Sequence, residues 1–282
     1  MQDTLLSVLA ENMLELRKAA DSLAKLTDVQ IHELSDAAKG QPDPILLFRS
    51  VFGDTLATRE YALFCRRLLR GRADTALIKA LLPEFTPLGD AYEDGDAAYP
   101  PNPFSDAAFR QFAENMPALR AQHQPSFNAA CEEVYHGRCR YCILPLQNTK
   151  DGVLTSFSHL MAKYELKIFR ICDITGDDGE SIIRFALLRR GIVPHVPEKG
   201  FFEIDVVLPE QISIGTFLCT ADALGARVEH MHTIPLAFAS GLTSLSVTVR
   251  ITRDCLAPLM LFLRTALDGY TAEGIYESAY QL

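Results

Sequence analysis

The last third of the chain alternates between two kinds of apolar periodicity, and this alternation limits the available folds more than any other feature. The segment from Phe201 to Leu208 alternates as in a strand with one buried face. Residues 213–224 then follow a helical period, and Gly225 ends the expected helix. The remaining segments indicate two strands, a helix and a final strand: 227–236, 242–251, 254–267 and 270–276. This β-α-β-β-α-β order predicts a ferredoxin-like sheet with two helices on one face.

The first third of the chain has the pattern of helices. Apolar residues recur at three- and four-residue steps from Leu5 to Leu23, and a further helix is expected from about Thr58 to Arg70. The stretch 83–104 is rich in proline and acidic residues and has no apolar period, so it predicts a long exposed loop. We therefore expect residues 1–104 to form a helical region that ends in this loop.

Residues 105–192 predict a small α/β unit between these two parts. Ser105 and Ser126 are expected to cap two helices, and the apolar run 141–146 is typical of a buried strand. Pro145 should lie near the end of that strand, because proline has no N–H to donate. Residues 166–172 and 182–188 have the pattern of strands, and residues 175–179 have the pattern of a turn. Together they predict a β-hairpin.

Composition limits the partners and the compartment. Hydrophobic residues make up 48% of the chain and charged residues 22%, which is typical of folded globular proteins. The net charge of −9 argues against a nucleic-acid partner, and the absence of a run of 18 apolar residues argues against a membrane span. No secretory signal begins the chain, and seven cysteines, an odd number, suit free thiols in the cytoplasm. We expect a cytoplasmic α+β protein with three parts: 1–104, 105–192 and 198–282.

Two segments carry motifs that can be compared with a known family. The first contains Cys142-Ile143-Leu144-Pro145-Leu146-Gln147-Asn148-Thr149 after a helix that ends at Gly137, and the second contains Ile183-Arg184-Phe185-Ala186-Leu187-Leu188. Together they resemble the prephenate dehydratase family, in which a Pro-Ile-Glu-Asn-Ser turn lines the substrate cleft. In that family a Thr-Arg-Phe strand precedes an ACT regulatory domain. The resemblance implies a ligand site at four residues, Gln147, Asn148, Thr149 and Arg184, and an ACT-like domain over residues 198–282.

The chain departs from this family at the residue implicated in catalysis. Ile183 stands where the family has the threonine of Thr-Arg-Phe, and an isoleucine side chain cannot donate a proton to the departing hydroxyl. Ser181, two residues earlier, is a candidate substitute, because alternate residues of a strand share a face. The family's second lobe is also missing, since only a short turn joins the strands that end near Cys172 and begin near Ile182. The resemblance thus implies a degenerate, single-lobe dehydratase domain with no assigned catalytic residue.

The ACT-like part departs from the family in its ligand motifs. Ile212 and Ser213 correspond to the family's Gly-Ala-Leu turn, and His232 and Thr233 correspond to its Glu-Ser-Arg-Pro motif. The resemblance implies that these four residues contact any regulatory ligand. Isoleucine in place of a ligand-contacting glycine adds bulk where the backbone approaches the ligand closely.

No metal or cofactor is predicted. Cys139 and Cys142 have the CxxC spacing, but a zinc site needs four ligands and no second pair exists, so a structural role is favoured. His230 and His232 alternate on one strand and are expected to be surface or interface histidines, which would make an interface sensitive to pH. Dinucleotide-binding and phosphate-loop motifs are absent from the sequence.

Three functions stay open. The first is a non-catalytic, ACT-containing protein that binds an amino acid or aromatic-pathway intermediate in a regulatory role in phenylalanine biosynthesis. The second is an active dehydratase, with a rebuilt site, that converts prephenate to phenylpyruvate. The third is an assembly protein whose ferredoxin-like part only dimerises. A homodimer is expected in each case, because strand 227–236 is a poorly protected edge and the hydroxyl face of strand 242–251 suits a packed contact.

Overall fold

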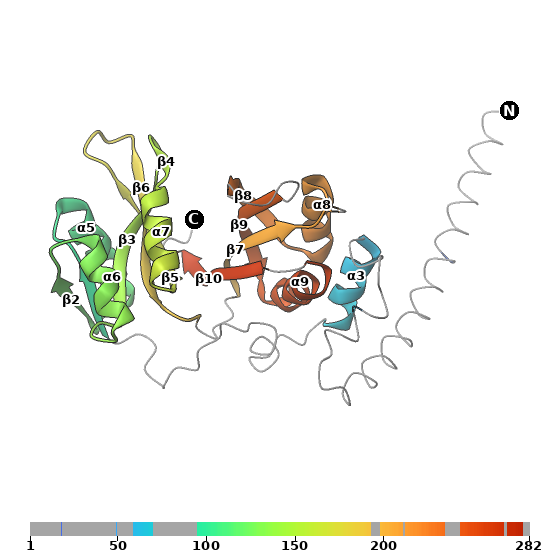
Figure 1. Ribbon diagram of the computed structural model, residues 1–282, viewed down its shortest axis with the longest axis horizontal. Helices are drawn as coiled ribbons and strands as arrows, with labels where there is room; N and C mark the ends of the chain where they lie inside the picture. Colours follow the sequence, from blue (N-terminus) through green and yellow to red (C-terminus); the bar gives the residue numbers. More distant parts are fainter. Residues whose placement is uncertain are drawn as a thin grey trace.

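The computed structural model of the protein describes Lys18, Arg49 and residues 59–69, 95–192, 198–210, 212–234, 243–267 and 270–278. These residues form a mixed α+β structure around one large sheet (Figure 1). The helical stretch expected from Leu5 to Leu23 lies outside the described residues, apart from Lys18, which is helical. None of the described helices is long and apolar enough to cross a membrane.

Residues 95–190 form the first half of the sheet, with helices on both faces. The elements in chain order are β1 (Gly95–Tyr99), α5 (Pro103–Asn115), β2 (Leu119–His123), α6 (Phe127–Tyr135), β3 (Tyr141–Asn148), β4 (Gly152–Val153), α7 (Thr155–Lys163), β5 (Leu166–Thr175) and β6 (Ile182–Arg190). β1 pairs in parallel with β2 and β3, and β6 is antiparallel to both β3 and β5. Successive residues of β3 bury on opposite faces: Tyr141 joins the cluster under α5, and Cys142 joins the cluster under α6 and α7.

Residues 199–278 form the second half of the sheet, with helices on one face only. The elements are β7 (Lys199–Leu208), α8 (Ile214–Leu224), β8 (Arg227–Ile234), β9 (Thr243–Thr252), α9 (Arg253–Ala266) and β10 (Tyr270–Ser278). Their strands are antiparallel to their neighbours and lie in the order β10-β7-β9-β8. Phe202, Ile204 and Val206 of β7 face the helices and are fully buried. β8 is an edge strand, as the sequence indicates.

β10 joins the two halves into one sheet. It pairs in parallel with β5 and antiparallel with β7, so that the full order is β2-β1-β3-β6-β5-β10-β7-β9-β8, with β4 beside β3. Gly274 allows this contact. A Cβ atom at that position would lie 2.5 Å from the carbonyl oxygen of Ile168 on β5, a separation that real Cβ atoms do not adopt. Glycine is therefore required for β10 to lie against β5.

α3 (Arg59–Leu68) packs against α8 and α9 rather than against the half of the sheet that follows it in sequence. Tyr61, Ala62 and Cys65 are buried in the same core as β7 and β9. The Tyr61 hydroxyl donates a hydrogen bond to Thr265 Oγ1 of α9 at 2.7 Å. Figure 1 shows α3 beside this layer, at the far side of the molecule from β2. The helical face of the second half is thus covered by part of the N-terminal region.

Arg66 of α3 contacts the end of a different helix. Arg66 Nη1 donates to the carbonyl oxygen of Ala223 at 3.1 Å, near the C-terminal end of α8. Arg49 acts similarly at the end of α9, where it donates to the carbonyl oxygens of Arg264 and Leu267. The last carbonyls of a helix have no partner within it, and cations are stabilising there. Two arginines from the N-terminal region therefore cap the two helices of the second half.

The prediction of an exposed loop over residues 83–104 is wrong for its last part. β1 occupies residues 95–99, and Ala97 and Ala98 are fully buried, because β1 lies between two parallel strands. Buried parallel strands carry no alternating pattern, and the flanking acidic residues and prolines hid this short run. Residues 83–94 lie outside the described residues. β2 was not predicted either, since Leu119 is its single buried residue.

Two local expectations are also corrected. Asn102, not Ser105, caps α5: its side-chain oxygen accepts hydrogen bonds from the backbone N–H groups of Phe104 and Ser105, and Ser105 is buried inside the helix. Pro145 lies within β3 rather than near its end. The register shifts between Pro145 and Gln147, and such a bulge accommodates a residue that lacks a donor. The cap by Ser126 and the β5–β6 hairpin are confirmed.

Candidate functional site

The end of β3 and the polar turn after it lie against the start of β6. Gln147 is opposite Arg184, and Asn148 is opposite Ile183. The side chains of Asn148 and Thr149 are hydrogen-bonded. Asn148 donates to Asp151 Oδ2 at 3.0 Å and accepts from the N–H of Lys150 at 3.0 Å, while Thr149 Oγ1 accepts from the N–H of Ile182 on β6. The Asn148 contacts are those of a side chain that stabilises its own turn.

The two residues considered for catalysis are also engaged in structure. Ser181 lies before β6, in the hairpin tip 176–181, where its hydroxyl donates to Asp178 Oδ1 at 2.7 Å. Asp178 also forms an ion pair with Lys150, and the hydrogen bond from Lys150 is the main reason that the pKa of Asp178 lies well below its usual range. Ile183 packs, half-buried, against the core under α5.

Arg184 is held by a carboxylate of the neighbouring strand. Its Nε and Nη2 donate to the two oxygens of Asp173 at 2.9 and 3.0 Å, so the pair is bidentate. This hydrogen bonding raises the pKa of Arg184. Asp173 and Arg184 are directly opposite in the β5–β6 register. The guanidinium expected to bind a ligand therefore already has a carboxylate partner.

The residues that correspond to the ACT ligand motifs have distinct surroundings. Ile212 is buried, and the hydroxyl of Ser213 caps α8 by accepting from the N–H of Thr216 at 3.1 Å. His232 and Thr233 are exposed on the edge strand β8. His232 lies opposite Ser246, and Ser246 lies opposite Asp205, so a polar row crosses β8, β9 and β7 on the face away from the helices.

The cysteine pair is buried. Cys139 and Cys142 belong to the core under α6 and α7, and burial holds the pKa of the Cys142 thiol well above its usual value. All seven cysteines are free thiols, and Cys219 on α8 is the exposed one. Among the described residues, no group of three or more histidine, cysteine, aspartate or glutamate side chains is arranged to hold a metal.

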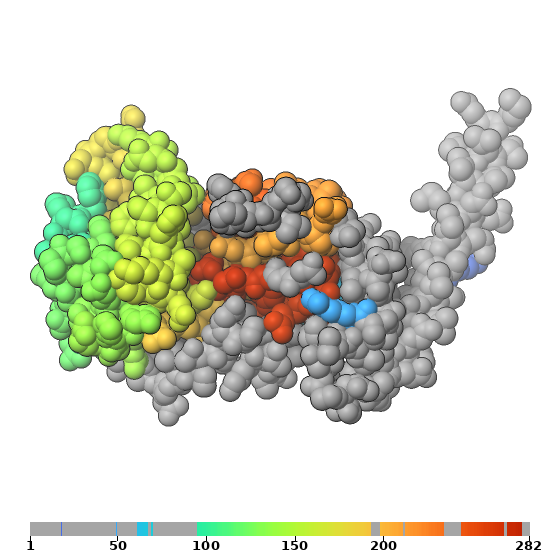
Figure 2. Space-filling view, in the orientation of Figure 1, coloured from blue at the N-terminus to red at the C-terminus, as the bar shows by residue number. Residues whose placement is uncertain are grey.

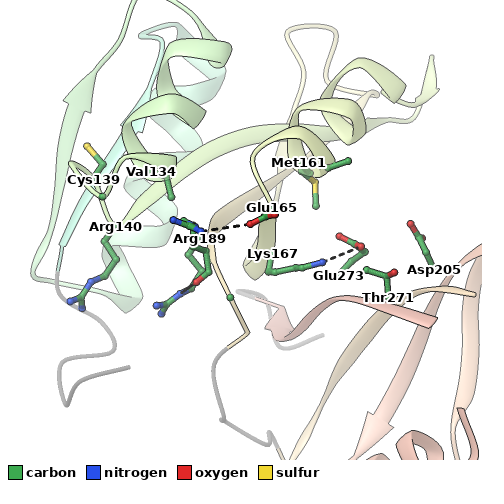
Figure 3. A pocket seen from close by; sticks show the side chains of 14 residues that line it. Val134, Cys139, Arg140, Met161, Glu165, Lys167, Arg189, Asp205, Thr271 and Glu273 are labelled. Carbon is green, nitrogen blue, oxygen red and sulfur yellow. Dashed lines mark hydrogen bonds and ion pairs between the residues drawn. The ribbon is translucent and has the colours of Figure 1, made fainter. Parts of the chain in front are cut away.

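A cavity of about 1080 Å³ lies where the two halves of the sheet meet (Figure 3). Its walls come from the ends of α6 and α7, the adjoining ends of β5 and β6, and the face of β7 and β10 that carries no helix. The cavity is lined by Val134, Gly137, Cys139, Arg140, Met161, Ala162, Glu165, Lys167, Arg189, Arg190, Gly191, Asp205, Thr271 and Glu273. It contains none of the residues predicted as sites from the sequence.

The charged groups that line this cavity from β5, β7 and β10 are largely shielded from water. Lys167 on β5 forms an ion pair with Glu273 on β10 at 3.3 Å, and their side chains are 12% and 19% exposed. Burial raises the pKa of Glu273 to about 7, against the opposing effect of Lys167. Burial likewise raises the pKa of Asp205, whose carboxylate is hydrogen-bonded by Ser246. Its Oδ1 atom has no hydrogen-bond partner among the described residues, although it is removed from water.

A third carboxyl group lies beside these two. Glu203, next to Asp205 on the same face of β7, accepts a hydrogen bond from the Tyr276 hydroxyl at 2.6 Å, and its pKa is raised by burial. The sequence did contain a signal for these residues. Glu203 and Asp205 alternate with the apolar residues of β7, which places both on the face away from the helices. Which part of the chain covers that face depends on the β5–β10 pairing, and no local pattern predicts this pairing.

Comparison with known proteins gives a likeness in fold. A prephenate dehydratase from Streptococcus mutans matches 66% of this chain and 99% of its own, with a TM-score of 0.51 and 17% identity. A prephenate dehydratase from Arthrobacter aurescens in complex with L-Phe matches 65% of this chain and 90% of its own, with a TM-score of 0.50 and 14% identity. This fold is similar to theirs. A protein described as GqqA, a novel type of quorum quenching acylase, matches 64% of this chain and 94% of its own, with a TM-score of 0.51 and 16% identity.

Sequence comparison adds no relative. No protein-family model matches the chain, and no curated protein matches it. TM-scores of 0.50 and 0.51 show a likeness in fold, and identities of 14 to 17% leave activity open. Function must therefore be argued from the residues.

Proposed function

We propose that this protein is a non-catalytic relative of the prephenate dehydratases that binds a small molecule in a regulatory role in the cytoplasm. The observation that carries the proposal is the β5–β6 connection. The strands pair along their whole length and are joined by the tight turn 176–181, so a second lobe has no place between them. The hydroxyl of Ser181 is bound to Asp178, and Ile183 is a half-buried apolar residue packed against the core, which supports the absence of a catalytic group.

In this proposal residues 198–282 form a ferredoxin-like, ACT-like domain that carries the regulatory function. The strand order β10-β7-β9-β8 with α8 and α9 on one face supports it. The ligand is an amino acid or an aromatic-pathway intermediate. Cavities at the junction of two parts of a chain, lined by apolar groups and a few charged ones, are favoured places for such ligands.

The test is an assay of purified protein with prephenate. We expect no phenylpyruvate above the spontaneous rate. Formation of phenylpyruvate by the protein would overturn the proposal and favour the alternative of an active dehydratase with a rebuilt site. If Ser181→Ala then abolished that activity, Ser181 would be the relocated proton donor.

We further propose a homodimer formed through the second half of the sheet. The edge position of β8 supports this, since no described strand pairs with its outer side and α3 already covers the helical face. Light scattering should give twice the mass of one chain. A monomer at all concentrations would exclude the dimer and, with it, the alternative of a pure assembly protein.

A further inference from the structure

The outer face of α8 is exposed and carries almost no charge. It consists of five residues at helical spacing, opposite the side that packs into the core: Ile214, Gly215, Leu218, Cys219 and Asp222. Ile214 and Leu218, one turn apart, are 38% and 36% exposed. Asp222 is the single charged residue of this helix. Figure 1 shows α8 on the outside of the second half, and Figure 2 has orange atoms at the surface in the same place.

Other described helices expose charged side chains where they face water. α5 exposes Arg110 and Glu114, and α7 exposes Lys163. The outer face of a surface helix is normally charged or polar, and a helix that is apolar on all sides is normally buried. The outer face of α8 therefore has the composition of a covered surface.

The N-terminal segment 5–23 carries an apolar stripe that needs a partner. Its apolar residues recur at three- and four-residue steps, so that Leu9, Met13 and Leu16 lie along one face of the expected helix. Lys18 is helical and exposed, and the helical period places it on the side opposite this stripe. A helix of this length is only marginally stable in water unless its apolar face packs against something.

The N-terminal region already packs on the layer that contains α8. α3 lies against α8 and α9, and Arg66 of α3 donates to the carbonyl oxygen of Ala223 near the end of α8. Arg49 is bound at the end of α9. Residues 24–48 connect the apolar stripe to Arg49, and an extended chain spans on the order of 3.3 Å per residue, so the stripe can reach α8. Attachment at Arg49 also raises the effective concentration of the stripe near this face.

We infer that residues 5–23 bind as an amphipathic helix along the outer face of α8 of the same chain, with their apolar stripe against Ile214 and Leu218. The contact buries these two side chains and leaves Lys18 in water. It also covers Cys219, which follows Leu218 on the same face. This inference goes beyond the proposed function, because it assigns a position to the N-terminal segment and requires no ligand.

The thiol of Cys219 reports whether this face is covered. It is the one exposed thiol among the seven free cysteines, so a neutral reagent such as N-ethylmaleimide should modify it first. We expect slow modification of the full-length protein, because the bound helix must open before the reagent enters. The double variant Leu9→Gln, Leu16→Gln removes two leucines from the stripe and keeps a good helix former at each position. It should increase the rate of Cys219 modification, followed by peptide mass spectrometry, by at least about tenfold.

Matched variants separate the outcomes. Lys18→Gln, on the opposite side of the same expected helix, should be modified at the wild-type rate. Ile214→Gln tests the contact from the α8 side and should also speed the modification, while α8 stays folded because Ile214 is exposed. The rates should not depend on protein concentration, since the contact lies within one chain. Equal rates in the wild type and the double variant would overturn the inference, and so would protection that is lost on dilution, which would assign this face to a second copy.

Discussion

Gly274 is the residue at which the two halves of the sheet come into contact. Gly274→Ala would place a Cβ atom 2.5 Å from the carbonyl oxygen and 2.7 Å from the Cβ of Ile168. Backbone atoms of a central strand cannot shift without disturbing its pairing, so we expect the free energy of unfolding to fall by about 3 kcal/mol. Urea denaturation measures it.

Gly215→Ala is the matched control at the residue scale. Its Cβ atom would meet only Ser213 Oγ, at 3.7 Å, which is an ordinary contact. Alanine is also the better helix former, so the free energy of unfolding should change by less than about 1 kcal/mol. Equal effects of the two substitutions would show that β10 does not depend on this close approach.

Asn148 supports its own turn, and Asn148→Ala tests that role. The substitution removes the hydrogen bonds to Asp151 and to the N–H of Lys150, so we expect a loss of about 1 kcal/mol in urea denaturation. Ligand binding should be unchanged. An unchanged stability with weaker ligand binding would instead restore the role that the family resemblance implies.

Among the elements, α3 provides the clearest test, because two adjacent residues of this helix, Ala62 and Leu63, differ in burial. Ala62 is fully buried against α8 and α9. Ala62→Glu would bury a carboxylate without a partner, and we expect α3 to detach at a cost of several kcal/mol, on the order of 3. Hydrogen exchange of the α8 backbone should then become faster, since α3 no longer covers it.

Leu63→Glu is the control for this element. Leu63 is 36% exposed, so a carboxylate there stays in water and stability should change by less than about 0.5 kcal/mol. If the backbone N–H groups of α8 exchanged more slowly in Ala62→Glu than in Leu63→Glu, the docking of α3 through Ala62 would be contradicted.

At the scale of the whole molecule, the junction of the two halves should depend on pH through Glu273. Burial raises its folded-state pKa to about 7, above its unfolded value. The Glu273 carboxyl therefore binds its proton more tightly in the folded state than in the unfolded state. The stability that this protonation contributes is present in full below about pH 4.5 and is lost as pH rises through 7. We expect the free energy of unfolding to fall by about 2 kcal/mol between pH 5 and 7.5.

Glu273→Gln should flatten this pH profile. A residual slope of the same sign is expected from Glu203 and Asp205, whose pKa values are also raised by burial. Asp178→Asn is the control. The pKa of Asp178 is lowered in the folded state, so its contribution to the free energy of unfolding is lost only in acid. This substitution should therefore leave the fall in stability between pH 5 and 7.5 unchanged. A slope untouched by Glu273→Gln would mean that another group titrates.

Local sequence patterns were sufficient for most elements. The side chain of Ser126 caps α6, and Gly225 ends α8 with a φ of +83°, a conformation that glycine adopts easily. The alternating residues of β7 and β9 bury on the face toward the helices, as their period requires. These features depend on residues that are close together in the sequence, so the sequence by itself determined them. It also determined the tight β5–β6 hairpin, on which the argument against a second lobe depends.

The tertiary structure alone decided how the parts combine. β10 pairs with β5, more than 100 positions earlier, and α3 packs on α8 and α9 at still greater separation. Such contacts are selected by the whole set of buried faces, and no local period encodes the partner. The cavity follows from them, since Lys167 and Glu273 meet only because β5 and β10 are neighbours. Among the polar residues taken from motifs, Asn148, Ser181 and Ser213 bind groups three residues away, because short-range hydrogen bonds satisfy them first.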